Sequence, residues 1–333
     1  MMPVRPPSRP ASALGVAASL PSTIASLAWI VGQCVADRWA WSQWLFWIPA
    51  WSIAVVAAGG CVAAWRWLGR GAWRNGARAA CLAALAWSVL RFAWCDVGWS
   101  PAAEAGSGTF SVVHWNPQCP GEASLACGNA LAANLGDVTI ITTPGSMLRH
   151  DARSLWLPDG FSSHDHGMFG IVSRIPVVEH RSVGAVSVPE VGTIALAWFV
   201  VRPHGGRDVR ILAIDLPRSL HRARGEVAAC LAAALSASAL PGAPDLVLGD
   251  LNCTPGSVIL PVAAPGMSSP PPWCASGWLA TYRRGWPLAR IDHMLAGPRL
   301  EWVGYRTIDL GCRLHLGQVG VFRSVDSAAG RGD

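Results

Sequence analysis

The sequence of 333 residues contains no lysine and little charge of either sign. All 26 basic residues are arginine, and charged residues make up only 14% of the chain, against about a quarter in typical soluble domains. Hydrophobic residues make up 52%, which excludes an extended disordered chain because such chains need low hydrophobicity and high net charge. Arginine without lysine indicates a bias of genomic composition rather than a function.

Cys-x-x-Cys spacing is also absent, although the chain has ten cysteines. A cysteine-rich zinc site is therefore not predicted. Cys119 and Cys127 are the closest pair in sequence, and they could form a disulfide if this part of the chain is exported. Reduced, buried thiols are the alternative for most of the cysteines.

Charge is missing from two long segments near the N-terminus, residues 10–36 and 39–65, and a third run at 79–95 carries only Arg91. About 20 mostly apolar residues span a membrane, so we predict three transmembrane helices at about 11–36, 39–65 and 76–97. Arg91 lies near the end of its run, where its side chain can reach the lipid headgroups. A signal peptide is the alternative for the first run, but two further apolar runs follow it.

The distribution of arginine predicts the orientation of these helices. Arg5 and Arg9 precede the first run, and four arginines stand between the second and third runs, at 66–78. Because excess positive charge marks the cytoplasmic side, we expect a multi-pass protein of the cell membrane with a cytoplasmic N-terminus. The chain after residue 99 is then periplasmic or extracellular. Three helices with one internal charge make a transporter or channel a weak alternative.

The net charge of +6 belongs entirely to this membrane region. Residues 1–99 contain eight arginines and two acidic residues, whereas residues 100–333 contain 18 of each. A neutral domain has no overall field that would attract a nucleic acid. The expected partners are therefore the lipid bilayer and a phosphate ester, and the sequence does not specify the oligomeric state.

Residues 100–326 are predicted to form one soluble domain, followed by a disordered tail at 327–333. Apolar, β-rich runs recur along it, at 110–115, 138–142, 169–172, 194–201, 209–214, 246–248, 291–295, 301–308 and 319–322. Alanine-rich helical patterns lie at 122–134 and 222–238. Many strands with few helices indicate an α/β or α+β sandwich.

The clearest chemical motif is Gly-Asp250-Leu-Asn252, which directly follows an apolar strand. A carboxylate and a carboxamide in this position suit phosphoester hydrolysis: Asp250 can take a proton from attacking water, and Asn252 can bind a phosphoryl oxygen. The structural alternative is an Asx-turn that closes the strand.

A second acid, Asp292, stands inside the apolar run 289–296. A buried carboxylate is costly unless it is paired, and His293 points to the opposite face of the strand. We therefore expect Asp292 to pair with His315, which precedes the last strand, and to orient that imidazole for acid–base chemistry. Asn116, at the end of the first strand, is a candidate oxygen ligand or phosphate contact.

His164-Asp165-His166 forms a third motif. In an extended chain both histidines lie on one face of the strand, as a metal site would require. A solvated loop is the simpler alternative.

In this order, Trp115-Asn116, Ser173-Arg174-Ile-Pro176, Gly-Asp250-Leu-Asn252 and Arg290-Ile-Asp292-His293 resemble the endonuclease/exonuclease/phosphatase superfamily over about residues 110–323. The resemblance implies a four-layer α/β sandwich with two packed mixed β-sheets flanked by helices. It also implies phosphoester hydrolysis with Mg²⁺ or Mn²⁺. Bacterial members with three N-terminal membrane helices look similar in layout.

The resemblance further implies roles for five residues. Asn116 would lie near the metal and contact the substrate, Asp250 would activate the water, and Asn252 would hold the phosphate. Asp292 would orient His315, which would stabilise the transition state.

Three positions depart from the family pattern. Thr143 stands where the family has its metal-binding Glu, Leu314 replaces an Asp, and Asp215 replaces a His. Because a hard dication prefers carboxylate oxygens, we expect weakened metal binding, with Asp215 as a candidate substitute ligand. Two hypotheses follow: a membrane-anchored phosphoesterase of unspecified substrate (nucleic acid, lipid or sugar phosphate), or a catalytically inactive domain of the same fold that binds or scaffolds at the membrane surface.

Overall fold

The computed structural model describes residues 13–68, 71–118, 124–188, 190, 192–218, 221–311 and 314–325. The chain divides into two compact units, Met1–Trp94 and Cys95–Asp333. The predicted tail at 327–333 and one partner of the predicted Cys119–Cys127 disulfide lie outside the described residues.

The first unit is helical in its described part, with α1 (Ala13–Val35), α2 (Ala40–Phe46), α3 (Ala50–Arg66) and α4 (Ala72–Arg91), the last continued by the π-helical turn η1 (Phe92–Asp96). Alanine is frequent in these segments and is the strongest helix former. Small residues let α1, α3 and α4 approach closely: a Cβ atom added at Gly60 would lie 2.7 Å from Cys81 Sγ and from Ser22 Cβ.

The second predicted membrane span, 39–65, is not one helix but two, α2 and α3. The break comes before Pro49, the N-cap of α3, because proline has no N–H to continue a preceding helix. In the described residues only Ala72–Asp96 is by itself long and apolar enough to cross a membrane. Ser19–Val35 and Ala40–Phe46 reach this length and apolar composition only when they are taken together, and they are bent by 116° relative to each other. Three separate spans are therefore not supported, and the described residues contain one helix of that length and composition.

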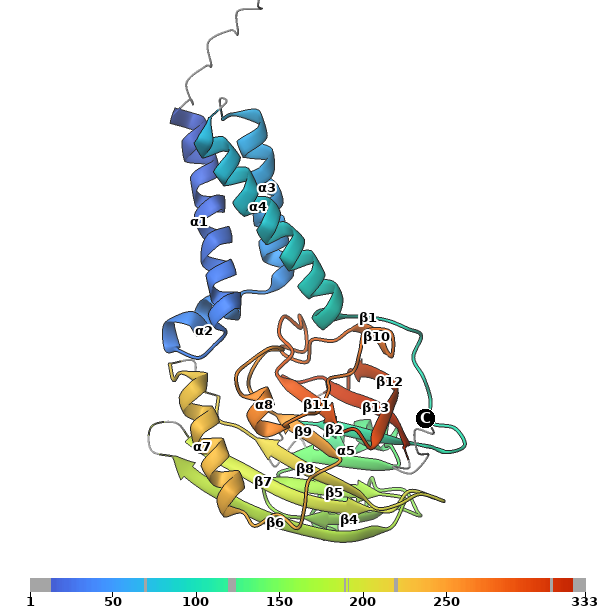
Figure 1. The fold of residues 1–333 in the computed structure, drawn as a ribbon. Coiled ribbons are helices and arrows are strands. Elements are labelled where there is room, and N and C mark those ends of the chain that lie inside the picture. Colours follow the sequence, from blue (N-terminus) through green and yellow to red (C-terminus); the bar gives the residue numbers. More distant parts are fainter. Residues whose placement is uncertain are drawn as a thin grey trace, which may run out of the picture. The chain divides into compact units, whose positions relative to one another are not determined.

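The second unit is built on two mixed β-sheets (Figure 1). Within the described residues, one sheet has eight strands, in the order β1 (Val97–Trp99), β10 (Ala275–Trp278), β12 (Leu300–Ile308), β13 (Gly317–Ser324), β2 (Thr109–Trp115), β3 (Val138–Thr142), β5 (Phe169–Ser173) and β4 (Ser162–Asp165). The other has five, in the order β11 (Asp292–Ala296), β9 (Leu246–Asp250), β8 (Val209–Asp215), β7 (Gly192–Val201) and β6 (Val177–Val188). The pairs β2–β3, β10–β12 and β8–β9 are parallel, and the others are antiparallel.

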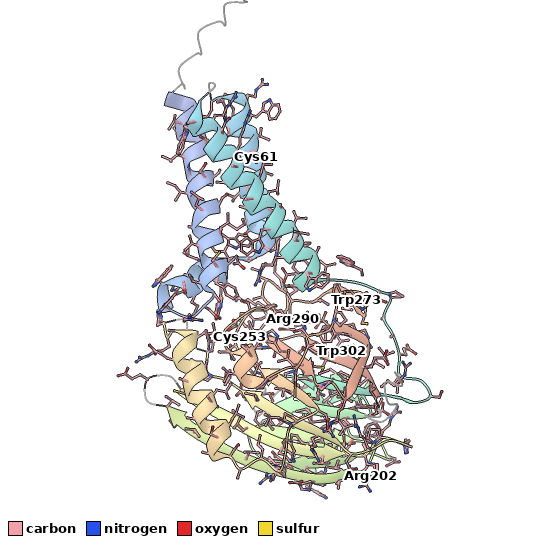
Figure 2. All side chains as sticks on the ribbon, in the orientation of Figure 1. Cys61, Arg202, Cys253, Trp273, Arg290 and Trp302 are labelled. Atoms are coloured by element: carbon pink, nitrogen blue, oxygen red, sulfur yellow. The ribbon has the colours of Figure 1, made fainter. Side chains whose placement is uncertain are left out.

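In the part of this unit that the structure describes, three apolar cores separate four layers. One core lies between the sheets and contains Trp302, labelled in Figure 2, whose ring is 4.5 Å from that of Phe322. A second joins the five-stranded sheet to α7 (Arg224–Ala237) and α8 (Leu260–Ala263). The third joins the eight-stranded sheet to α5 (Ser124–Ala132) and to the segment that includes α6 (His150–Arg153). This is the sandwich of two mixed sheets flanked by helices that the sequence predicts.

The Ser173-Arg174-Ile-Pro176 motif fixes the end of β5. Asp137 accepts hydrogen bonds from the Ser111 backbone and hydroxyl and from Arg174 Nε, at 2.7–2.8 Å. The Ser173 hydroxyl donates to backbone oxygens of Asp137 and Ile175, at 3.1 and 2.7 Å. The motif therefore has a structural role, because its hydrogen bonds hold the end of β5 against the start of β3.

Candidate active site

Three aspartates form a row across the five-stranded sheet. Asp215 of β8 is in register with Asp250 of β9, and Asp250 is in register with Asp292 of β11. Two positions away on the same strands lie the core residues Ala213, Leu248 and Met294. Because side chains alternate between faces along a strand, all three carboxylates project on the side of the sheet that faces the other sheet.

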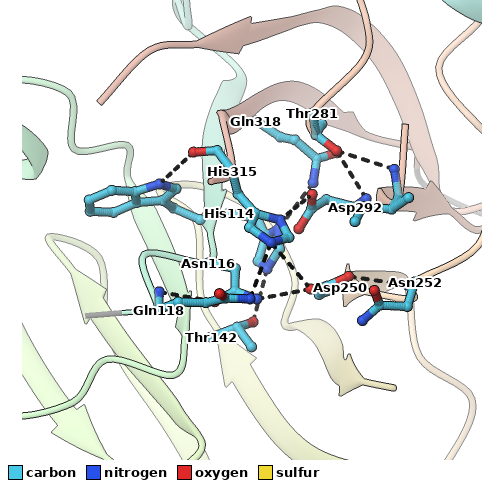
Figure 3. A network of polar contacts seen from close by, with 12 residues as sticks. His114, Asn116, Gln118, Thr142, Asp250, Asn252, Thr281, Asp292, His315 and Gln318 are labelled. Atoms are coloured by element: carbon cyan, nitrogen blue, oxygen red, sulfur yellow. Dashed lines mark hydrogen bonds and ion pairs between the residues drawn. The ribbon is translucent and has the colours of Figure 1, made fainter. Parts of the chain in front are cut away.

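His315 is the partner of Asp292: His315 Nδ1 lies 3.0 Å from Asp292 Oδ2, and both side chains are buried (Figure 3). Local hydrogen bonds hold both residues in place. The Thr281 hydroxyl accepts the N–H of Asp292 at 3.1 Å, and Trp115 Nε1 donates to the carbonyl of His315 at 3.3 Å. His315 Nε2 also lies 3.8 Å from Asp250 Oδ2, so one imidazole stands between two carboxylates.

The interaction between Asp292 and His315 shifts their pKa values in opposite directions. Burial alone would lower the pKa of His315, but Asp292, followed by Asp250 and Asp215, raises it to about 9. Burial opposes ionisation of Asp292, yet the charge and hydrogen bond of His315 hold its pKa below the usual value. The pair is therefore an imidazolium and a carboxylate at neutral pH. The charged ring carries hydrogen on both nitrogens. In the structure the amide nitrogen of Gln118 lies 3.3 Å from His315 Nε2, so the Gln118 amide must turn over to present its oxygen to the charged ring.

The other two carboxyl groups are harder to ionise. Burial and the negative charge of Asp292 raise the pKa of Asp250 well above its ordinary value, although His315 opposes the shift. The same two causes raise the pKa of Asp215 to about 7. Asp215 therefore belongs to the electrostatic environment of the site.

Asn116 connects Asp250 to the eight-stranded sheet. Its Nδ2 donates to Asp250 Oδ2 at 2.9 Å, and its Oδ1 accepts from the Thr143 hydroxyl at 2.6 Å and from the Gln118 N–H at 3.3 Å. Thr143 has a φ of 47°, a backbone conformation that is rare for a β-branched residue. The amide oxygen that the sequence assigns to a metal thus already accepts two hydrogen bonds.

Asn252 has the local geometry of the structural alternative. Asp250 Oδ1 accepts its N–H at 3.1 Å, which closes an Asx-turn, and Asn252 Nδ2 donates to the carbonyl of Leu216 at 2.7 Å. Asp250 therefore uses one oxygen for the turn and directs the other toward Asn116 and His315. Leu314, where the family has an Asp, contributes its carbonyl to a hydrogen bond from the Arg284 N–H, at 2.8 Å.

A buried layer of polar side chains lies beneath the site and is not predicted from the sequence. His114 lies between Thr142 and Gln318, with 3.0 Å to each, and Gln318 Oε1 accepts from the Tyr305 hydroxyl at 2.6 Å. Burial lowers the pKa of His114 to about 4, so its ring is neutral. The signal was available, because His114 stands at an inward-facing position two residues before Asn116.

The donor set fits a hard dication. Asp250 and Asp292 each offer a carboxylate oxygen, and these oxygens and a nitrogen of His315 lie within 4.8 Å of one another. Because the imidazolium of His315 has hydrogen on both nitrogens, the two carboxylates are the ligands. Asp292 Oδ1 is buried and has no hydrogen-bond partner among the residues that the structure describes. If ionised, the three carboxylates of the row exceed the one imidazolium by two negative charges, which a divalent cation would balance.

The model of the Endonuclease/Exonuclease/phosphatase family matches residues 86–307. Similar solved structures include a humanised D. rerio TDP2, with 15% identity over 66% of this chain and 100% of that chain and a TM-score of 0.47. An endonuclease/exonuclease/phosphatase from Bacteroides vulgatus has 12% identity over 65% and 99% of the two chains and a TM-score of 0.48.

The 3'-5' exonuclease NExo from Neisseria meningitidis has 16% identity over 64% of this chain and 99% of that chain, with a TM-score of 0.45. No curated protein matches the chain significantly. The family match covers more than half of the sequence and spans every motif that suggested the resemblance. The chain therefore belongs to the Endonuclease/Exonuclease/phosphatase family.

Proposed function

We propose that the protein hydrolyses a phosphoester, with water as the nucleophile, at the site of Asp250, Asp292 and His315. The observation that carries the proposal is the position of the buried His315 ring, 3.0 Å from Asp292 and 3.8 Å from Asp250. Burying two acids around one imidazole is costly for a purely structural element, whereas such perturbed groups are typical of catalytic sites.

Asp250 is the proposed general base. Its raised pKa makes the ionised carboxylate of Asp250 a stronger base than an ordinary aspartate. The Asn116 amide orients the oxygen that faces His315, and the Asx-turn with Asn252 fixes the other oxygen. The water attacks phosphorus as its proton passes to Asp250, the bond from phosphorus to the ester oxygen breaks, and the leaving alcohol oxygen takes a proton from solvent.

His315 is the proposed electrostatic partner of the substrate. Its imidazolium, held by Asp292, stabilises the negative charge that develops on the phosphoryl oxygens. The second hydrogen of the Asn252 amide is available to a phosphoryl oxygen, in line with the role that the resemblance implies.

Asp250 and Asp292 would hold the Mg²⁺ or Mn²⁺ ion, with Asp215 as the substitute for the missing family acid. When bound, the ion would polarise the phosphoryl group.

One observation favours an inactive binding or scaffold domain as the second candidate. Thr143 is neutral and bonds the Asn116 oxygen, so this side of the site lacks the carboxylate of the family pattern. The two candidates differ in whether a divalent cation binds at all.

The helix Ala72–Asp96 is the proposed membrane anchor. Arg74 and Arg78 near its start favour a cytoplasmic location for that end, which would put the second unit on the opposite side. Protease protection in membrane vesicles tests this topology, because cleavage of the second unit from the cytoplasmic side would contradict it.

Turnover by the full chain in detergent tests the proposed activity. We expect hydrolysis of bis-p-nitrophenyl phosphate or p-nitrophenyl phosphate with Mg²⁺ or Mn²⁺, and its loss with EDTA. Asp250→Asn should reduce kcat by roughly 10²–10⁴-fold, whereas the matched surface variant Asp208→Asn should not. Absence of metal-dependent turnover above the Asp250→Asn background would favour the inactive domain.

A further inference from the structure

Three histidines gather at one edge of the second unit, away from the carboxylate row. His164 belongs to β4, His166 follows that strand, and His180 belongs to β6. β4 is the last strand of the eight-stranded sheet, and β6 is the last strand of the five-stranded sheet. Two of the side chains therefore come from the edge strands of the two sheets, and the third comes from the residue that follows β4.

The backbone register brings these side chains together. His164 and His166 are two residues apart, which places them on the same face of an extended chain. His180 is in register with Phe199, whose side chain belongs to the core between the sheets. His180 therefore projects on the inner side of its sheet, and the His166 ring lies 6.0 Å from the ring of Phe199.

The rings are in direct contact. His166 Nε2 lies 2.9 Å from His180 Nδ1, and the ring of His164 stacks on that of His180 with 3.8 Å between centroids. All three side chains are partly or largely exposed to solvent, so an ion can reach them.

We propose that His164, His166 and His180 form a binding site for a borderline transition-metal ion such as Zn²⁺, separate from the candidate active site. Imidazole nitrogen is a preferred ligand of Zn²⁺, whereas Mg²⁺ prefers oxygen. Two Zn–N bonds of about 2.0–2.1 Å at a tetrahedral angle place their nitrogens about 3.3 Å apart. The His166–His180 contact needs to open by only a few tenths of an ångström, and His164 supplies the third nitrogen by rotating out of its stack.

Burial and the neighbouring charges favour the metal-binding form of two of the ligands, His164 and His166. Burial, the other two histidines and Arg153 lower the pKa of His164. Burial and His180 lower the pKa of His166, against the opposing charge of Asp165. Neutral imidazoles are the species that bind metals, and the lowered pKa values of His164 and His166 favour that form.

Metal binding here would join the edges of the two sheets. Asp165 accepts the Gly167 N–H at 2.8 Å in the turn between β4 and β5. The next residue, Met168, accepts the Thr143 N–H at 2.8 Å. The ion would therefore brace the turn that supports Thr143, and it should stabilise the folded chain because folding brings its three ligands together.

Zn²⁺ titration of the untagged full chain in detergent tests the site, in an Asp250→Asn background with excess Mg²⁺ so that the carboxylates do not contribute. We expect one Zn²⁺ to bind, and His164→Gln, His166→Gln and His180→Gln each to weaken binding by at least about tenfold. The exposed His204 offers a matched control, and His204→Gln should bind Zn²⁺ normally. Equal affinity in all four variants, or no binding in the parent, would overturn the proposal.

Thermal unfolding separates metal binding from a folding defect. Without Zn²⁺, His180→Gln should keep the Tm of its parent because glutamine fits an exposed strand position. With Zn²⁺, the Tm should rise in the parent and in His204→Gln but stay unchanged in His180→Gln. A Zn²⁺-induced rise that persists in His180→Gln would place the ion elsewhere. None of these readouts depends on hydrolytic activity.

Discussion

Replacing Asp292 by asparagine removes one buried negative charge from the site and keeps the shape of the side chain. The amide oxygen can still accept the hydrogen on His315 Nδ1, and the Asp292 N–H that donates to Thr281 is backbone and stays in place. The variant therefore isolates the effect of charge on the imidazole.

The magnitude follows from the pKa of His315. Asp292 is the largest of the contributions that raise it to about 9, against a burial effect that lowers it. Without Asp292 the pKa should fall to about 6.5, its unperturbed value, or below. A fall from about 9 to about 6.5 corresponds to roughly 3.4 kcal/mol at 1.36 kcal/mol per unit, which agrees with the roughly 3–5 kcal/mol lost when a buried ion pair is broken.

The sign of the pH effect is fixed by the direction of this shift. Because the folded pKa of His315 is raised, the stability from its protonation is complete below about pH 6.5 and is lost as the pH rises through about 9. Asp292→Asn should remove this loss at alkaline pH.

The assay is an NMR titration of the histidine rings in the metal-free full chain. His315 should titrate near pH 9 in the parent and in the control Asp208→Asn, and at about pH 6.5 or lower in Asp292→Asn. A His315 resonance that still titrates near pH 9 in Asp292→Asn would refute the assignment of Asp292 as its principal partner.

Two further predictions concern the hydrogen bonds of Asp137 at the end of β5 and the orientation of the Asp250 carboxylate by Asn116. Asp137→Asn should lower the free energy of unfolding by about 2 kcal/mol, because the carboxylate accepts bonds from Ser111 and Arg174. Burial alone would raise the pKa of Asp137, but these bonds hold it low. The difference seen by denaturant titration should therefore disappear as the pH falls below about 4. Asn116→Ala should reduce kcat on the order of 100-fold, because Asp250 loses the hydrogen bond that positions it. An unchanged kcat in this variant would contradict the positioning role of Asn116.

Much of the candidate site could be predicted because it follows from local rules. Asp250 and Asp292 interrupt apolar strands, and alternation along each strand determines the face on which their side chains lie. The need of a buried carboxylate for a cation then selected His315 over His293, which points to the opposite face. His293 instead bonds the carbonyl of Cys253, at 2.8 Å.

Features that depend on contacts distant in sequence were not predictable. β6 is an edge strand whose residues alternate between partly buried and exposed over most of its length, so it lacks the apolar run that marks a central strand. The register of β6 shifts between Val177 and Glu179. No local sequence pattern predicts that His180 contacts His164 and His166. Pro49 could have indicated the break between α2 and α3, but the apolar residues on both sides of it favoured one continuous membrane span.

Hydrolysis in ¹⁸O-labelled water tests the central claim most directly. If water activated by Asp250 attacks phosphorus, one labelled oxygen enters the phosphate product at each turnover, and Asp250→Asn abolishes this incorporation while Asp208→Asn retains it. Label in the alcohol product, or undiminished incorporation by Asp250→Asn, would contradict the account.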